Sequence, residues 1–323
     1  MRILIIGGGG MVGQKLARKL AADGDIGGEA ISDLILQDIV EPADVEAAFP
    51  VTRMTGNIAA AGEAEKLAAL KADVIYLLAA IVSGEAEQDF DKGWNVNARG
   101  TWELLEAIRQ VGEGYRPKLV FSSSIAVFGA PFPPRIPDDF FSTPLTSYGA
   151  QKAMGELLIT DYSRKGFIDG VSLRLPTVCV RPGKANLAAS SFFSGIIREP
   201  LNGKEAILPV ADTVRHWFAS PRATAGFLTH AAELNLDMLD NRRALTMPGL
   251  SCTVAEQIEA LREIAGEEVV KRIKHQPDDA IIAIVRNWPE NFEARRAEAL
   301  GFVAESDFRQ IIRIYIEEDL EKA

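Results

Sequence analysis

Tyr148 and Lys152 stand four residues apart in the stretch TSYGAQKAMGELL (146–158), and together they could move a proton. A helix places side chains at this spacing on one face. The pKa of a free tyrosine is about 10, so its phenol is a poor base at neutral pH. A lysine cation close by favours the phenolate and lowers that pKa. The pair suits removal of a proton from an alcohol, although the same spacing also occurs on helices by chance.

A run of serines, SSS (122–124), ends the apolar stretch that precedes this helix. A hydroxyl at the end of a strand can hydrogen-bond the oxygen of a reacting alcohol and hold it near a base. Three serines at a strand end would equally well form a polar turn. The run by itself therefore leaves open both its role and which of the three serines matters.

The elements that must position these residues alternate regularly in the first half of the chain. Apolar runs predict strands over 2–7, 33–39, 51–58, 73–80, 118–124 and 170–176, and amphipathic periods predict helices over 11–23, 64–72, 97–112 and 147–165. Strands buried on both faces and separated by crossover helices are typical of a parallel, doubly wound sheet. We therefore expect an α/β protein with a Rossmann fold.

Glycines follow the first predicted strand with the spacing Gly7-x-x-Gly10-x-x-Gly13, at the point where the first helix begins. Glycines let the backbone approach phosphates closely, and a helix N-terminus offers free N–H groups and a positive dipole. Four consecutive glycines can also make a plain turn. Their place at the first strand–helix junction favours a dinucleotide-binding loop, with Met11 and Val12 also at the cofactor.

Asp38 ends the second predicted strand and is the candidate for recognising a ribose. A carboxylate there can accept both ribose hydroxyls of NAD and would repel the 2′-phosphate of NADP. A turn residue at the end of a strand is the other explanation. No Lys or Arg follows directly, because Ile39 and Val40 come next, so NAD is the expected cofactor.

Several motifs in a fixed order give the first 180 residues or so a specific resemblance. Beyond the glycine loop they are TGNI (55–58), LLAA (77–80), NARGTWELLEA (97–107), VFSSSIAVFG (120–129) and YGAQK (148–152). This set resembles the extended short-chain dehydrogenase/reductase family, the NAD-dependent epimerase/dehydratase group. The resemblance implies an NAD-dependent enzyme, and it implies a homodimer in which helices 97–112 and 147–165 pair.

The resemblance also implies roles for particular residues. It selects Ser124 as the serine that holds the reacting oxygen, Tyr148 as the base, and Lys152 as the residue that activates Tyr148 and holds the nicotinamide ribose. Asn97 would tie the structure near the site together through backbone contacts. The remaining cofactor-binding positions implied are Asn57, Ile58, Leu78, Ala79 and Ala80. Asn57 departs from the family, which usually has aspartate there.

The regular alternation stops after residue 176, where loop signals multiply. We predict an NAD-binding domain over 1–176, to which 211–240 returns, and a smaller α/β substrate-binding domain over most of 177–323. Thr253 and Glu256 form a capping box, which predicts the start of a helix. Further predictions are a helix at 190–201, a strand at 281–289, a helix ending at Gly301 and a terminal helix at 306–320.

The second half resembles the D-erythronate dehydrogenase branch, whose enzymes oxidise C2 of a four-carbon sugar acid. The similar pieces are RPGKAN (181–186), SSFFSGIIREPLNG (190–203), RHWFASPRA (215–223), MPGLSCTV (247–254) and the closing stretch 296–320. Thr177, Cys179 and Ser220-Pro221 depart from the pattern of relatives that act on nucleotide sugars. The expected reaction is therefore oxidation of a small sugar acid to a 2-keto acid.

A small carboxylate substrate needs a cation, preferably the planar fork of an arginine. Among Arg174, Arg181, Arg215 and Arg222, the family pattern favours Arg215, although an ion pair elsewhere would explain it equally well. Other candidate substrate contacts are Ser83, Ser124, Thr177 and Arg181. Beside a better Tyr/Lys pair, His216 is interpreted as structural.

Composition narrows the remaining classes. The 323 residues are 47% hydrophobic and 25% charged, which suits a globular protein with a full core. Lys+Arg is 35 and Asp+Glu is 45, so the net charge of −10 argues against nucleic acid as a partner. The 2 cysteines and 3 histidines show no metal spacing. No apolar run approaches a membrane span, and a cytoplasmic protein is expected.

Three functions stay open at this point. The first is a sugar-acid dehydrogenase that releases NADH. The second is a nucleotide-sugar epimerase or dehydratase that keeps its NAD and recycles the hydride. The third is an NAD-binding redox sensor without chemistry, against which the joint presence of Ser124, Tyr148 and Lys152 argues.

Overall fold

The computed structural model describes residues 1–183 and 190–320. The end of the RPGKAN stretch and two short pieces of the predicted 177–323 domain therefore lie outside the described residues. The chain forms two compact units. Unit 1 contains Met1–Val127, Thr146–Arg174 and Ala225–Leu245; unit 2 contains Phe128–Leu145, Leu175–Thr224 and Thr246–Ala323. The domain boundaries given above stay a prediction.

A seven-stranded sheet forms the centre of unit 1, in the order β12-β8-β7-β6-β1-β4-β5. Its strands are β1 (Arg2–Ile6), β4 (Asp33–Asp38), β5 (Val51–Thr55), β6 (Val74–Leu77), β7 (Lys118–Ser124), β8 (Asp169–Leu175) and β12 (Ala244–Thr246). Both neighbours of β1 run parallel to it, as do β5 beside β4 and β7 beside β6. The predicted α/β fold with a doubly wound parallel sheet is confirmed.

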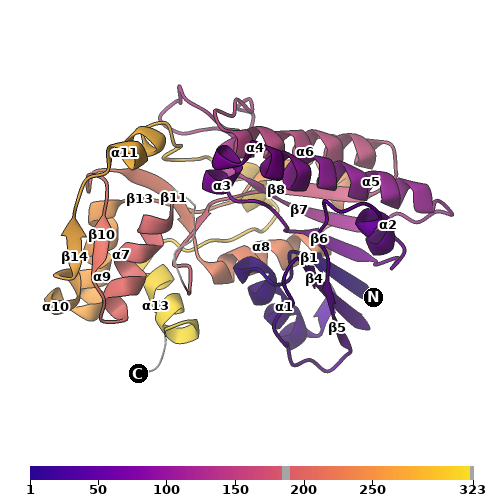
Figure 1. Cartoon of the computed structure of the whole chain (residues 1–323), viewed down its shortest axis with the longest axis horizontal. Helices are drawn as coiled ribbons and strands as arrows, with labels where there is room; N and C mark the ends of the chain where they lie inside the picture. The colour runs from indigo at the N-terminus through magenta and orange to yellow at the C-terminus, as the bar shows by residue number, and fades with distance from the viewer. Residues whose placement is uncertain (184–189, 321–323) are drawn as a thin grey trace. The chain divides into compact units, whose positions relative to one another are not determined.

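Helices cover both faces of this sheet (Figure 1). One face carries α5 (Gly100–Val111) and α6 (Ser147–Arg164), and the other carries α1 (Met11–Asp23) and α8 (Pro221–Glu233). Shorter elements complete unit 1: β2 (Asp25–Ile26), β3 (Glu29–Ala30), α2 (Glu63–Ala68), α3 (Ser83–Gln88), α4 (Phe90–Gly93), η2 (Ile125–Val127) and η3 (Leu236–Leu239). The predicted helix 97–112 is preceded by a π-helical turn, η1 (Trp94–Arg99), a feature often found at functional sites.

Unit 2 is built from small sheets and helices around its own core. Its strands are β9 (Thr177–Val178), β10 (Ala206–Leu208), β11 (Arg215–Ala219), β13 (Leu250–Thr253) and β14 (Ile273–His275). Its helices are α7 (Ser191–Leu201), α9 (Val254–Ala265), α10 (Glu267–Val270), α11 (Asp279–Val285), α12 (Arg295–Ala299) and α13 (Phe308–Glu318). The predicted capping box is present, with Thr253 Oγ1 accepting from Glu256 N at 3.1 Å.

The strand predicted at 281–289 is wrong, because this segment contains most of helix α11. The Asp278 side chain accepts hydrogen bonds from the N–H groups of Ala280 and Ile281 and starts the helix. Ile281, Ile282 and Val285 then pack on the core of unit 2. Six apolar residues in a row fit a buried strand and a short buried helix equally well, and the cap decides between them.

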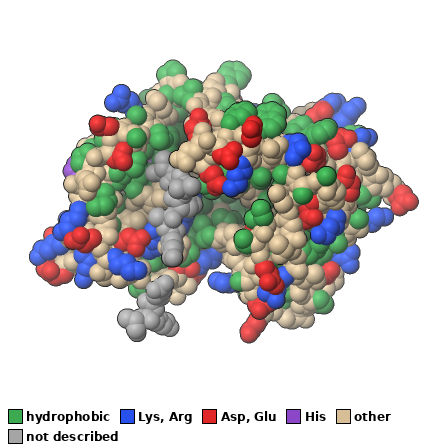
Figure 2. Space-filling model, viewed as in Figure 1, with side chains coloured by type: hydrophobic (Ala, Val, Ile, Leu, Met, Phe, Trp, Pro, Cys, Tyr) green, Lys and Arg blue, Asp and Glu red, His purple; other side chains and the backbone are tan. Residues whose placement is uncertain are grey.

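Unit 1 exposes large apolar side chains on its α4–α6 layer, where Figure 2 shows hydrophobic atoms at the surface. The exposed residues of this layer are Phe90, Trp94, Trp102, Met154 and Leu157. Leu157 is 73% exposed. Large apolar side chains gathered on one face in this way can mark an interaction surface. No helix among residues 1–183 and 190–320 is long and apolar enough to cross a membrane.

Candidate active site

Tyr148 and Lys152 lie in the first two turns of α6, which the structure starts with a local cap. Thr146 Oγ1 accepts from Gly149 N at 3.1 Å, so the helix begins directly before Tyr148. The Lys152 ammonium lies 5.7 Å from the centre of the Tyr148 ring and 4.6 Å from that of the Phe121 ring. It donates a hydrogen bond to Ser122 O at 2.7 Å. The expected pair therefore shares one helix face beside the end of β7.

Lys152 is unusual because it is 2% exposed. Burial disfavours its charged form and lowers the pKa of Lys152 to about 7, while the Glu156 carboxylate acts in the opposite direction. The charge that would lower the pKa of Tyr148 thus depends near neutral pH on the groups packed around the lysine.

The three serine hydroxyls at the end of β7 have different partners. Ser122 Oγ donates to Leu77 O at 3.1 Å, and Ser123 Oγ donates to Glu156 Oε1 at 2.5 Å. Ser124 Oγ accepts from Ala126 N at 3.1 Å. Among the described residues, only the Ser124 proton of these three remains to be donated to a substrate oxygen.

The glycine loop has the shape of a cradle that a side chain would fill. Gly7 has a φ of +96°, and a Cβ on it would lie 2.5 Å from Ala79 N. A Cβ on Gly13 would lie 2.2 Å from Gly7 O, whereas Gly10 would meet no atom closer than 3.5 Å. Met11, Val12 and Gly13 form the first turn of α1, whose N–H groups an α-helix leaves without internal partners. The residues present therefore fit a dinucleotide pyrophosphate.

Asp38 ends β4 next to this loop. Its Oδ2 accepts from Gly9 N at 2.9 Å, and its Oδ1 accepts from Ile39 N at 2.7 Å. The carboxylate is thus oriented by backbone donors in the position where a ribose is expected. Farther along this edge, Asn57 Oδ1 accepts from Ala59 N at 3.0 Å, and the Ile58 side chain is buried in the core, so Ile58 can offer a ligand mainly its backbone.

Asn97, in the π-helical turn, fixes the segment that follows β6. Its side chain accepts from Ile81 N at 2.8 Å and donates to Ile81 O at 3.0 Å, and it also donates to Gln151 Oε1 at 2.7 Å. At the start of that segment, Leu78 N and Ala79 N both donate to Ile6 O. Asn97 therefore links α6 to the backbone around Leu78, Ala79 and Ala80.

The candidate substrate residues are spread over both units. Ser83 begins α3 in unit 1, whereas Thr177, Arg181 and Arg215 belong to unit 2. Arg181 Nε donates to Val178 O at 3.2 Å. Arg215 donates to Ser251 O at 3.1 Å and lies 3.3 Å from the Glu256 carboxylate.

The other two arginines considered from the sequence hold ion pairs. Arg174 pairs with Glu156 at 2.8 Å, and Arg222 pairs with Glu317 at 2.8 Å and with Glu318 at 2.5 Å. Arg215 also holds an ion pair, with Glu256, so these contacts by themselves do not select one of the arginines as the substrate ligand.

His216 is a buried structural residue, as interpreted from the sequence. Its Nδ1 lies 3.0 Å from Pro289 O, which can only accept, so Nδ1 carries the proton. Its Nε2 lies 2.7 Å from Thr177 Oγ1 and accepts the hydroxyl proton. Burial lowers the pKa of His216 to about 4 and keeps the ring neutral. The ring thereby orients Thr177, whose oxygen can still accept a hydrogen bond.

Comparisons with known proteins identify the family of the chain. Residues 3–232 match the model of the NAD dependent epimerase/dehydratase family. The chain belongs to this family. NAD is the cofactor that the family uses, and the glycine cradle of unit 1 fits it.

Two relatives from this epimerase/dehydratase family match over almost their whole length. D-erythronate dehydrogenase of Cupriavidus necator is 45% identical over 322 residues, covering 98% of each chain. D-erythronate dehydrogenase of Haemophilus influenzae is 41% identical over 320 residues, covering 99% of this chain and 100% of the relative. A solved structure from Agrobacterium tumefaciens, described as a nucleoside-diphosphate-sugar epimerase, has a TM-score of 0.96 and 53% identity, covering 100% of this chain and 95% of the other.

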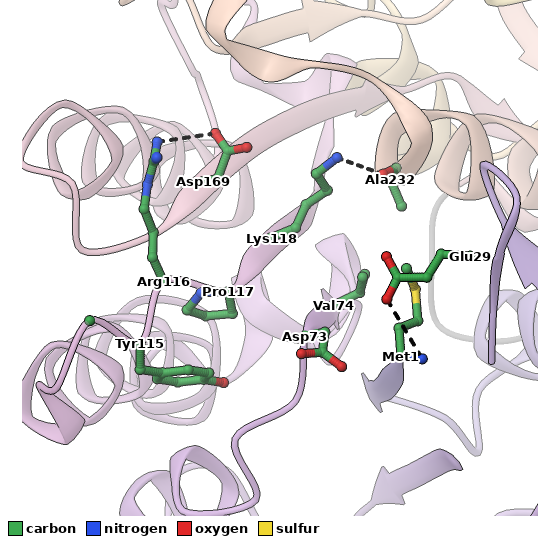
Figure 3. A pocket seen from close by; sticks show the side chains of 11 residues that line it. Met1, Glu29, Asp73, Val74, Tyr115, Arg116, Pro117, Lys118, Asp169 and Ala232 are labelled. Atoms are coloured by element: carbon green, nitrogen blue, oxygen red, sulfur yellow. Dashed lines mark hydrogen bonds and ion pairs between the residues drawn. The ribbon is translucent and has the colours of Figure 1, made fainter. Parts of the chain in front are cut away.

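A cavity of about 520 Å³ lies elsewhere in unit 1 (Figure 3). It is lined at the amino ends of strands by residues such as Met1, Asp73 and Lys118, opposite to the strand ends that carry Ala79 and Ser124. Its charged groups have protein partners: Lys118 Nζ donates to Ala232 O at 2.6 Å, and Arg116 pairs with Asp169. Proteins with a doubly wound sheet bind ligands at the carboxyl ends of the strands, so this cavity is not the candidate site.

The sequence reasoning missed the buried polar residues that support the Tyr/Lys pair. Gln151 precedes Lys152 and binds Asn97, and Glu156 follows Lys152 by one turn. The sequence signal for this contact was the spacing of Glu156, a carboxylate four residues after Lys152. Its burial could not be foreseen, because charged residues at this spacing usually pair at the helix surface.

Replacing Lys152 with methionine is expected to raise the free energy of unfolding at pH 7 by about 1–3 kcal/mol. The pKa of Lys152 falls from 10.5 to about 7 on folding, so the folded state is penalised most at and below pH 7. The penalty disappears as the pH rises toward 10.5, because the unfolded chain also loses the proton there.

Urea unfolding at pH 7 and pH 9.5 measures this difference. Lys165→Met, at the exposed end of the same helix, is the control and should change stability little at either pH. A Lys152→Met protein less stable than the parent at pH 7 would contradict the expectation.

Proposed function

We propose that this protein is an NAD-dependent dehydrogenase that oxidises the C2 hydroxyl of a small sugar acid, such as D-erythronate, to the 2-keto acid. The observation that carries the proposal is the near full-length identity of 45% and 41% to two D-erythronate dehydrogenases. The Tyr148, Lys152 and Ser124 geometry supports it, because an alcohol oxidation needs a base and a donor to the reacting oxygen.

In the proposed mechanism, Ser124 donates a hydrogen bond to the C2 oxygen and holds it near Tyr148. The Tyr148 phenolate takes the hydroxyl proton, and the charged Lys152 stabilises that phenolate. Held by the glycine loop and Lys152, NAD would supply the acceptor for the hydride that leaves C2. Tyr148 is thereby protonated, and the proton must pass to solvent before the next turnover.

The proposed cofactor contacts follow the carboxyl edge of the sheet. Gly7, Gly10, Met11, Val12 and Gly13 would hold the pyrophosphate, and Asp38 would accept the adenosine ribose hydroxyls. The remaining contacts would come from Asn57, Ile58, Leu78, Ala79, Ala80 and Asn97, together with Lys152 and Tyr148 at the nicotinamide side. The preference for NAD over NADP rests on Asp38, whose charge disfavours a 2′-phosphate.

In unit 2, we propose Arg215 as the partner of the substrate carboxylate. Its guanidinium is part-buried and is held by Ser251 O and by the Glu256 carboxylate, so a substrate carboxylate would bind there by replacing Glu256. Ser83, Thr177 and Arg181 are further proposed contacts to the substrate hydroxyls and carboxylate.

A nucleoside-diphosphate-sugar epimerase is the alternative, and the Agrobacterium tumefaciens structure described in those words favours it. Incubation with NAD and a panel of tetronates, pentonates and UDP- or dTDP-sugars, followed at 340 nm, separates the two. Stoichiometric NADH from a free sugar acid supports the dehydrogenase. Turnover of a sugar nucleotide without net NADH would refute it.

Tyr148→Phe is expected to lower kcat by at least about 100-fold, because the base is removed. NAD affinity, measured by calorimetry, should change little. The matched control is Tyr162→Phe on the same helix, whose phenol binds Glu106. Turnover retained by Tyr148→Phe would exclude Tyr148 as the base.

Arg215→Met is expected to raise the KM for the sugar acid about 10- to 100-fold, since a hydrogen bond to a charged group contributes about 1.5–3 kcal/mol. The KM for NAD should stay within a factor of two or so. Arg222→Met, which removes an exposed ion-paired arginine, is the control. Equal KM values for the two variants would assign the carboxylate to another residue.

We propose further that the protein forms a homodimer through the apolar α4–α6 layer described above. Trp94 of the π-helical turn, Trp102 of α5 and Leu157 of α6 are large, exposed apolar side chains. A second copy of the same surface would bury them. The cytoplasmic location inferred from the sequence stays a prediction.

Leu157→Arg is expected to convert the dimer to a monomer at micromolar concentration, because a charge introduced on an apolar dimer face would be buried without a partner. Light scattering after size exclusion measures the mass. Val303→Arg, at an equally exposed apolar residue of unit 2, should leave the mass unchanged. A Leu157→Arg protein with the mass of the parent would rule out this face.

A further inference from the structure

A buried polar network supports Lys152 from the side away from Tyr148. Glu156 follows Lys152 by one helical turn on α6. Its Oε1 accepts from Ser123 Oγ at 2.5 Å and from Arg174 Nε at 3.0 Å, and its Oε2 accepts from Arg174 Nη2 at 2.8 Å. Three elements, α6, β7 and β8, therefore meet at one carboxylate.

All four members of this network are buried. Glu156 is 4% exposed, and Ser123, Lys152 and Arg174 are also shielded from water. A buried carboxylate persists in its charged form only where donors and opposite charges compensate for lost hydration. The fork of Arg174 supplies both, so the Glu156 charge is fixed close to Lys152.

Among residues 1–183 and 190–320, Glu156 is the charged group that acts on Lys152. On α6 its neighbours are Tyr148 and Glu156, while β7 contributes Ser122 O and the Phe121 ring. Most charged residues of the other packed elements bind elsewhere: Glu87 of α3 accepts from Ser147 N, Lys92 of α4 pairs with Glu85, Arg99 of η1 pairs with Glu103, and Glu106 of α5 pairs with Arg109 and Tyr162. Asp91 of α4 is exposed to solvent. Arg174 of β8 reaches Glu156.

We propose that Glu156, held by Arg174 and Ser123, is a positioning residue that keeps Lys152 charged beside Tyr148. The inference rests on the proposed function, in which the lysine cation stabilises the tyrosine phenolate. Burial alone drives Lys152 toward its neutral form, and the fixed negative charge one turn away opposes this. Arg174 limits the effect, since its own cation partly cancels the carboxylate.

The two partners predict shifts of opposite sign. Removing the Glu156 charge leaves Lys152 with the Arg174 cation nearby and without the carboxylate, so Lys152 should lose its proton at lower pH. Removing Arg174 removes the cation that partly cancels the Glu156 charge, so Lys152 should keep its proton to higher pH. A unit charge one helical turn away in a buried site corresponds to a shift of about 1 to 2 pH units.

The titration of Lys152 tests this without any substrate. The ¹³Cε chemical shift in protein labelled with ¹³C-lysine is followed from pH 5 to 10, and Lys152→Met identifies the signal. Glu156→Gln should lower the midpoint by about 1 to 2 pH units, and Arg174→Met should raise it. Asp161→Asn, an exposed carboxylate on the same helix, should leave it unchanged. If Glu156→Gln does not fold, Arg174→Met decides alone.

The pH profile of kcat/KM, with any substrate that the enzyme accepts, gives the second readout. Its acid limb should move to higher pH in Glu156→Gln, because a neutral Lys152 leaves the pKa of Tyr148 higher. A merely structural Glu156 would lower the melting temperature and move neither the lysine titration nor the acid limb, and that result overturns the proposal. Failure of every sugar acid in the panel would instead refute the proposed function, and the lysine titration would still decide the role of Glu156.

Discussion

Burial of a lysine ammonium beneath the end of the central sheet is the constraint on which the rest of unit 1 depends. Lys152 is 2% exposed, so fixed protein groups must stabilise its charge in place of water: Ser122 O, the Phe121 ring and the Glu156 carboxylate. Each comes from a rigid element. A sheet strand and a long helix must therefore meet at close range, and Gly155 permits this, since a Cβ there would lie 2.6 Å from the Phe121 ring.

Close packing also shapes the carboxyl edge of the sheet, where the cofactor is expected to bind. The parallel strands end together, which brings the glycine loop, Asp38 and the segment after β6 to one edge although they are distant in sequence. Close backbone packing, as between Gly7 and Ala79, is possible only without side chains. Asn97 then holds that segment through both backbone groups of Ile81, so the edge is fixed before any ligand arrives.

Unit 2 contains a buried titratable residue, His216, that is kept neutral. His216 is buried among aromatic rings, stacked on Phe193 at 5.3 Å, and stays uncharged. Its two ring nitrogens bind separate partners, Pro289 O and Thr177 Oγ1, so the neutral ring holds the Thr177 hydroxyl in a fixed orientation. A buried histidine can stay neutral with both ring nitrogens hydrogen-bonded, whereas a buried lysine that must be charged needs a compensating carboxylate.

The sequence by itself determined the α/β class, the order of strands and helices in the first half and the position of the glycine loop, because these follow from short-range periodicity and spacing. The roles of Tyr148 and Lys152 came from the ordered set of motifs that resembles the family. It failed at 281–289, where a single cap made a helix of an apolar run. Only the tertiary structure decided which partners the three serine hydroxyls bind, and that Glu156 turns inward to Arg174. Those outcomes depend on partners from other strands, and one helix or strand cannot specify what packs against it.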